Sequence, residues 1–230
     1  MCLLTKLIKP QWLLAMAIFS PAIFAESINF ASGDTQNTVI ELYTSEGCSS
    51  CPPAERWISN MKDHPKLFSE IIPLAFHVDY WNYLGWRDKF SKAEYSQRQQ
   101  QHYRERNVSQ VYTPDVLKNG NEYRQWSQGQ VYASGENVGK LEVKIIDETV
   151  NIEFHPQQPS VRLVAHVTLL GFGFKSQVSS GENAGKTLPQ DFVVLKHSVE
   201  VSSINRWSMA LPQSSLQAEK YAIAVWISRS

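Results

Sequence analysis

The sequence predicts an α/β domain followed by an all-β antiparallel domain, and two observations support this. From residue 38 to about residue 124, strand signals alternate with helical ones. After about residue 130, apolar residues alternate with polar ones, and the short segments are separated by Gly, Pro, Ser and Asn, which is typical of a small antiparallel sandwich. We therefore expect one domain at residues 38–126 and a second, β-rich domain at residues 127–230.

The first domain begins with an apolar strand that leads directly into a pair of cysteines. A polar stretch without Gly or Pro follows later and favours a surface helix, and Asn119-Gly120 is typical of a hairpin turn. The expected elements are a strand at 38–44, a helix at 53–61, a strand at 71–78, a helix at 89–106 and short strands at 115–118 and 122–124.

The second domain is expected to consist of strands that begin near Leu141. The expected strands cover residues 141–145, 150–154, 161–170, 192–201, 206–211 and 221–227. One motif occurs twice, as SGENVGK at residues 134–140 and SGENAGK at 180–186. Two similar glycine-rich turns explain it most simply; the alternative is a pair of matched loops that form a binding edge.

The first 25 residues have the pattern of a secretory signal peptide. Lys6 and Lys9 precede an apolar run at residues 12–24, and Ala25 is a plausible cleavage point. The run is short for a membrane span, so an uncleaved anchor is the weaker alternative. We expect a periplasmic or secreted protein with no stable membrane anchor after cleavage, and a linker at residues 26–37.

The charge balance argues against nucleic acid as a partner. The chain has 22 basic and 22 acidic residues and a formal net charge of zero. No run of Lys or Arg provides the basic surface that a nucleic-acid-binding domain uses. We expect no nucleic-acid partner; the oligomeric state does not follow from the sequence.

Cys48 and Cys51 are the candidate catalytic residues. Of the three cysteines, Cys2 lies in the expected signal peptide, so these two can only pair with each other. A Cys-x-x-Cys pair between a strand and a helix points to thiol–disulfide chemistry, because the helix N-terminus stabilises a thiolate. We expect Cys48 to attack and Cys51 to resolve, without a cofactor.

Three other interpretations of the pair compete with redox chemistry. A structural disulfide across so short a loop gains little stability. Zinc takes four ligands, usually from two such pairs, and the sequence has no second pair. Copper bound by Cys48, Cys51 and His77 suits soft thiolates and an imidazole, so copper handling ranks second after redox chemistry. We expect no resident metal.

Other candidate site residues are chosen for their positions in the sequence relative to this pair. Glu41 interrupts an apolar strand; if buried beneath the cysteines, it would have a raised pKa and could accept the Cys51 proton, and if not, it is a surface residue. Tyr112, Thr113 and Pro114 precede a short strand, where a cis proline could present backbone groups to a substrate. His77 and Trp81 belong to an aromatic segment, residues 77–86, that is either a substrate-docking wall or a core plug.

Four motifs together resemble a family of bacterial secreted proteins of unknown function. They are ELYTSEGCSSCPPAE at residues 41–55, AFHVDYW at 75–81, VYTP at 111–114 and GENAGKTL at 181–188. The resemblance implies a fold class of an α/β thioredoxin-like domain followed by an all-β antiparallel sandwich-like domain. It also implies that Cys48 and Cys51 match the redox pair of thioredoxin-like folds, and Pro114 their cis proline.

Two departures from the thioredoxin pattern are visible. Gly47 stands where those folds usually have tryptophan, so an aromatic wall would come from elsewhere, with Trp81 as the candidate. The last helix is not evident between residues 125 and 141, so the fold would be trimmed or completed by the second domain. The expected function is exported thiol–disulfide exchange with protein or small-molecule thiols; the alternative is copper handling or partner binding without redox turnover.

Overall fold

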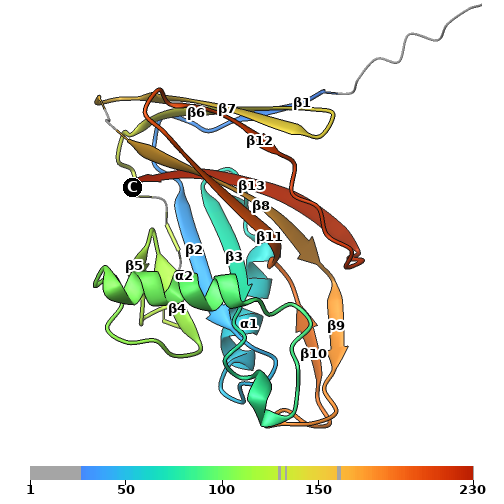
Figure 1. Ribbon diagram of the computed structural model, residues 1–230. Coiled ribbons are helices and arrows are strands. Elements are labelled where there is room, and N and C mark those ends of the chain that lie inside the picture. Colours follow the sequence, from blue (N-terminus) through green and yellow to red (C-terminus); the bar gives the residue numbers. More distant parts are fainter. Residues whose placement is uncertain (1–26, 129–130, 133, 160–161, 230) are drawn as a thin grey trace, which may run out of the picture.

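A seven-stranded mixed sheet, here called the central sheet, forms the middle of the molecule (Figure 1). The computed structural model describes residues 27–128, 131–132, 134–159 and 162–229; the expected signal peptide, residues 1–25, lies outside them. The strand order is β13-β8-β11-β3-β2-β4-β5. The strands are β2 (Thr38–Thr44), β3 (Ile71–His77), β4 (Asp115–Lys118), β5 (Asn121–Glu122), β8 (Leu163–Phe172), β11 (Val193–Ser202) and β13 (Lys220–Arg229).

This sheet corrects the predicted fold class. Strands predominate in the structure, and β8, β11 and β13 from the second half of the chain share one sheet with β2 and β3 from the first half. The chain therefore does not form an α/β thioredoxin-like domain followed by a separate sandwich. The reason lies in β3, since all seven of its residues are buried and its two edges must both be covered.

Strand β11 covers the edge of β3 that faces away from β2. Val193 pairs in parallel with Ala75, and the Ala75 N–H donates to the Phe192 carbonyl at 2.8 Å. On its other side, β11 runs antiparallel to β8. A strand from late in the sequence thus completes the sheet that the early strands begin.

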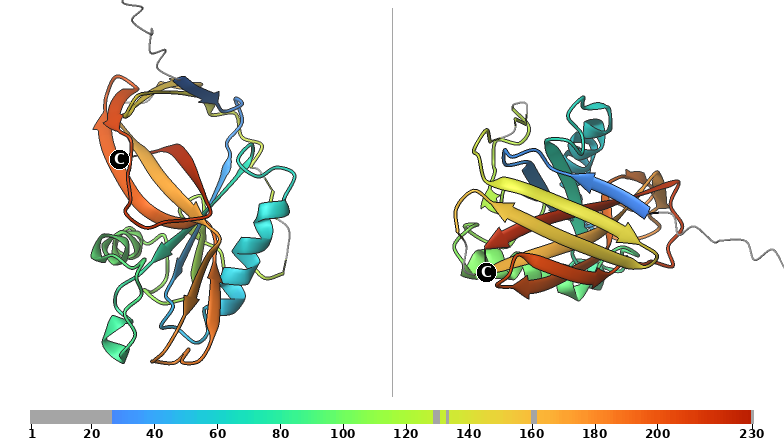
Figure 2. Two further views of the ribbon diagram at one scale, coloured as in Figure 1. Left: turned by 90° about the vertical axis from the view of Figure 1, so that its right-hand side faces the viewer. Right: turned by 90° about the horizontal axis from the view of Figure 1, so that it is seen from above.

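A second, four-stranded antiparallel sheet, here called the upper sheet, packs over one end of the central sheet (Figure 2). Its order is β1-β6-β7-β12. Val143, Ile152 and Trp207 of this sheet form an apolar core with Val167 and Val225 of the central sheet. The strands are β1 (Ser27–Ala31), β6 (Gly139–Ile146), β7 (Thr149–Pro156) and β12 (Arg206–Ala210).

Two α-helices lie on opposite faces of the central sheet (Figure 2). Helix α1 (Pro52–Ser59) follows β2 and continues as a 3₁₀ turn, η1 (Asn60–Asp63). Helix α2 (Ala93–Arg104) follows β3, after a loop with a second 3₁₀ turn, η2 (Asn82–Leu84). No helix in the described ranges has both the length and the apolar character needed to cross a membrane.

A two-stranded hairpin extends away from the central sheet and reaches the N-terminal end of α1 (Figure 1). It consists of β9 (Phe174–Gln177) and β10 (Thr187–Gln190), which among the described strands pair only with each other. Its tip, residues 178–186, contains the second copy of the repeated SGEN motif. The hairpin therefore brings residues from late in the chain to the cysteine pair.

Candidate functional site

Cys48 and Cys51 form a disulfide at the N-terminus of α1, with their Cα atoms 5.4 Å apart. The Cys48 N–H donates to the Ser45 carbonyl at 3.1 Å, which folds the chain into a turn as soon as β2 ends. Cys51 is the residue before the helix, and Pro52 occupies its first position, where no N–H is needed. Both cysteines are fully buried, although the two serines between them are exposed.

Trp81 connects the disulfide loop to the loop that carries the proline. A Cβ atom on Gly47 would lie only 3.2 Å from the Trp81 Cβ, so glycine leaves room for this side chain. The Trp81 Nε1–H donates to the Thr113 hydroxyl at 2.8 Å, and the Thr113–Pro114 peptide bond is cis. Tyr112 is half-buried beside it, and its carbonyl accepts from Gln99. The structure thus brings Trp81, Thr113 and Pro114 together near the cysteine loop.

Glu41 is buried, but it does not lie beneath the cysteines. Its carboxylate faces α2 and accepts two bonds from Arg98, at 2.9 and 2.8 Å, and one from the Tyr43 hydroxyl at 2.9 Å. Burial alone would raise the pKa of Glu41, but the Arg98 guanidinium holds it well below its usual range. The expectation of a raised pKa was wrong because alternate residues of β2 point to opposite faces, and α1 covers the other face.

Glu55 is the buried carboxyl on the face of the sheet that α1 covers. It is 4% exposed, and the Thr44 hydroxyl at the end of β2 donates to its Oε1 at 2.7 Å. Burial raises the pKa of Glu55 to about 7. Cys51 and Glu55 are one helical turn apart, so they lie on the same side of α1. The sequence does not single out this residue, because an acid in the first turn of a helix is ordinary.

His77 joins a buried group of ionisable side chains beside Glu55. Its Nδ1 lies 2.7 Å from Asp88 Oδ2, and both side chains are fully buried. Burial alone would lower the pKa of His77, but Asp88 raises it above its usual value. Asp88 also accepts from the Glu46 N–H at 2.9 Å, and burial raises the pKa of Glu46. His77 therefore lies behind the cysteine loop and not on a surface where a substrate could contact it.

The tip of the β9–β10 hairpin lies on the outer side of the same loop. The buried side-chain amide of Asn183 donates to the carbonyl oxygens of Glu46 and Cys48, both at 2.9 Å. Glu182 Oε2 accepts from the Ser49 N–H at 3.0 Å. The only sequence signal for this contact is the repeated SGEN motif, which does not identify the cysteine loop as its partner.

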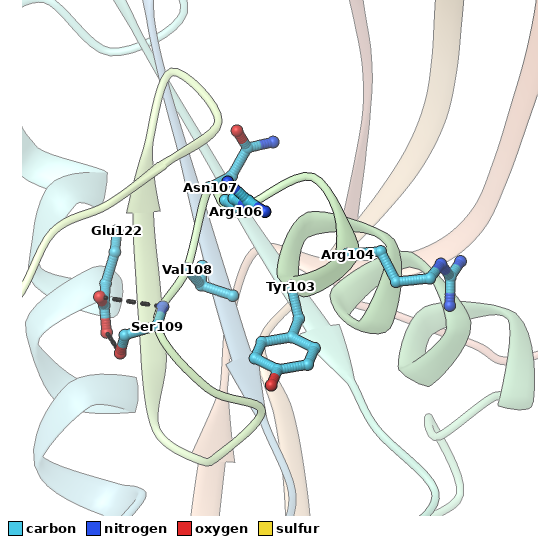
Figure 3. A pocket seen from close by; sticks show the side chains of 7 residues that line it. All are labelled: Tyr103, Arg104, Arg106, Asn107, Val108, Ser109 and Glu122. Carbon is cyan, nitrogen blue, oxygen red and sulfur yellow. Dashed lines mark hydrogen bonds between the residues drawn. The ribbon is translucent and has the colours of Figure 1, made fainter.

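One of the surface cavities, of about 530 Å³, lies at the C-terminal end of α2 (Figure 3). Figure 3 shows Ser109 bonded to the carboxylate of Glu122, which also accepts from Tyr112 and Arg124. Because this acid is already paired within the protein, we place the candidate site at the disulfide and not in the cavity. Among the described residues, no group of three or more His, Cys, Asp or Glu side chains could hold a metal ion.

The fold and the site together define a β-rich protein with two large sheets and a buried disulfide at a helix N-terminus. Residues 39–228 match the family described as "Protein of unknown function (DUF1223)", and the chain belongs to this family. The resemblance to a family of unknown function is thereby confirmed. No curated protein matches the sequence.

Two solved structures share the fold. The crystal structure of protein AGR_C_4864 from Agrobacterium tumefaciens is 24% identical, with a TM-score of 0.58, over 79% of this chain and 80% of that chain. HBP35 of Porphyromonas gingivalis is 10% identical, with a TM-score of 0.51, over 85% of this chain and 70% of that chain. At these identities the likeness concerns the fold alone.

Proposed function

We propose that this protein exchanges disulfides with thiols through Cys48 and Cys51. One observation carries the proposal: the disulfide closes at the N-terminus of α1, one turn from a buried carboxyl whose pKa is about 7. A group that titrates near neutral pH can give and take protons at the pH where it works. A purely structural bridge would need no such neighbour.

The exchange begins when a substrate thiolate attacks the Cys48 sulfur. The Cys48–Cys51 bond breaks, its electron pair leaves on the Cys51 sulfur, and protonated Glu55 supplies a proton to that thiolate. A second substrate thiolate then attacks the substrate sulfur of the mixed disulfide and releases Cys48. The substrate dithiol is oxidised to a disulfide and the cysteine pair is reduced; the reverse sequence oxidises the pair.

The helix supports the assignment of Cys48 as the attacking residue in the reverse direction. Free N–H groups and the dipole at a helix N-terminus stabilise a thiolate and lower its pKa. Exposed Ser49 and Ser50 present the side of the loop that a partner would approach. Protein thiols or small thiols are the proposed partners, and the half-buried side chains of Trp81 and Thr113, which are joined by a hydrogen bond, are the proposed contacts for a docked chain.

A trapping experiment tests the proposal. In the reduced protein, we expect an alkylating reagent to modify Cys48 faster than Cys51, as measured by mass spectrometry. Cys51→Ser should accumulate a mixed disulfide with a thiol substrate, whereas the matched Cys48→Ser variant should accumulate none. Equal alkylation of the two cysteines and no trapped complex in Cys51→Ser would rule the proposal out.

Export is a further part of the proposal and rests on the first 25 residues. An oxidising compartment would keep the disulfide formed between turnovers. A fusion of the full chain to a reporter enzyme that is active only outside the cytoplasm would test this. Activity that persists when residues 1–25 are removed would contradict it.

A further inference from the structure

Side chains of the hairpin tip, residues 178–186, form hydrogen bonds with backbone groups of the cysteine loop. Asn183 binds the carbonyl oxygens of Glu46 and Cys48, and Glu182 binds the Ser49 N–H. Figure 1 and the left-hand view of Figure 2 both place the tip beside the N-terminal end of α1. Two side chains from late in the chain thus fix the turn that carries the first cysteine.

Asn183 is itself held in one orientation. Lys186 Nζ donates to its Oδ1 at 2.8 Å, so both N–H groups and the oxygen of the side-chain amide have partners. The Ser180 hydroxyl donates to the Gly85 carbonyl at 2.6 Å, which ties the tip to the aromatic loop. Polar contacts therefore attach the tip both to the cysteine loop and to Gly85.

Both sulfur atoms belong to fully buried residues, yet exchange requires a thiolate to reach one of them. Something must move, and β2 and α1 are held by the core. The hairpin has only two four-residue strands that pair with each other; Phe174 is buried at its base, and Val178 and Leu188 are buried next to the tip. Short peripheral segments open locally at a lower free-energy cost than the strands and helices of the core.

We propose that the hairpin tip is a cap on the Cys48–Cys51 disulfide, that Asn183 is the positioning residue that holds it shut, and that the cap opens before each exchange step. The role of the cap in turnover rests on the proposed function. Its effect on access to the sulfur atoms does not, because a phosphine reduces any disulfide that it can reach.

The chain offers a matched control for this residue. The first copy of the motif places Asn137 at the position that corresponds to Asn183, but Asn137 is exposed and lies far from the cysteines in the sequence. Lys140 corresponds in the same way to Lys186. Substitutions at the first copy change the composition equally and leave the cap intact.

Reduction of the oxidised full-length protein by a water-soluble phosphine tests the cap. Because Asn183→Ala removes two hydrogen bonds to the loop, we expect reduction to be roughly tenfold faster, and Asn137→Ala to react at the parent rate. In the parent protein the rate should not change with urea below the unfolding transition, since opening of the cap exposes little surface.

Two results would overturn the cap. One is a folded Asn183→Ala protein that is reduced at the parent rate; the other is a parent rate that rises with urea as steeply as global unfolding does. If Asn183→Ala does not fold, Lys186→Met is the deciding variant. Lys186 is exposed, and its substitution removes the hydrogen bond that holds the Asn183 side chain in place. We then expect reduction a few times faster than in Lys140→Met, and equal rates would reject the cap.

A second assay, thiol–disulfide exchange with a peptide that contains cysteine, distinguishes failure of the cap from failure of the proposed function. Faster phosphine reduction of Asn183→Ala without any thiol exchange would support the cap and reject the function. Exchange in the parent protein with an unchanged phosphine rate in Asn183→Ala would support the function and reject the cap.

Discussion

Replacing Glu55 by glutamine removes the buried ionisable group nearest in sequence to Cys51 while keeping a similar shape. The pKa of this carboxyl is about 7 in the folded protein, against an ordinary value of 4.5. At 1.36 kcal/mol for each pKa unit, this difference makes the buried carboxylate about 3 kcal/mol less favourable than an exposed one. The unfolded chain therefore loses this proton at lower pH than the folded protein does.

Stability should fall as pH rises through this window, because the unfolded state binds fewer protons between pH 4.5 and about 7. The contribution of neutral Glu55 is complete below pH 4.5 and is lost above pH 7. Relative to the parent protein, Glu55→Gln should thus gain up to about 3 kcal/mol in free energy of unfolding between pH 4.5 and pH 8.

Urea denaturation of the two oxidised proteins at several pH values measures this difference. Other titrating groups, including His77, are present in both proteins, so the difference between them isolates the effect of Glu55 to first order. A difference that stays constant across the pH range would refute the argument, since it would mean that Glu55 titrates alike in the folded and unfolded states.

Three further predictions concern other parts of the structure. Glu41→Gln leaves Arg98 buried without its carboxylate, so urea denaturation should show a loss of about 3–5 kcal/mol, while the alkylation rates of the two cysteines should keep their ratio. Burial lowers the pKa of His197 to about 3, so its contribution to stability is complete above pH 6.5 and should be lost as pH falls towards 3. The free energy of unfolding of His197→Gln should therefore fall less steeply between pH 6.5 and pH 3. An unchanged dependence on acid pH in this variant would contradict the prediction. Gly47→Ala adds a Cβ only 3.2 Å from that of Trp81, so we expect a shift in tryptophan fluorescence and a loss of about 1–3 kcal/mol; an unshifted spectrum would show that the space is not tight.

Local signals predicted most individual elements correctly. The apolar run at β2, the Asn119-Gly120 turn and the alternation through β6 and β7 all formed as expected. The sequence missed β1, which is exposed along its whole length, and the short hairpin of β9 and β10. These strands have little apolar pattern of their own, and they are extended because they pair with neighbouring strands.

The assembly of the strands was not predictable from local pattern. The pairing of Val193 with Ala75 joins residues 118 positions apart, and nothing near either residue specifies the other. For the same reason, local pattern could not predict which acidic residue lies near the cysteines. Glu41 attracted attention because it interrupts an apolar strand, but which carboxyl lies behind the cysteines depends on which helix covers which face. Only the cysteine pair was evident from spacing alone.

The insertion of β11 between β3 and β8 has a consequence for how the chain folds. Strand β3 cannot be covered on both edges until residue 193 has left the ribosome, so the first half of the protein has no complete core of its own during synthesis. Contacts of such large sequence separation are slow to form, because the entropy of closing the loop must be overcome first. The central sheet would therefore stay incomplete through most of the synthesis of the chain.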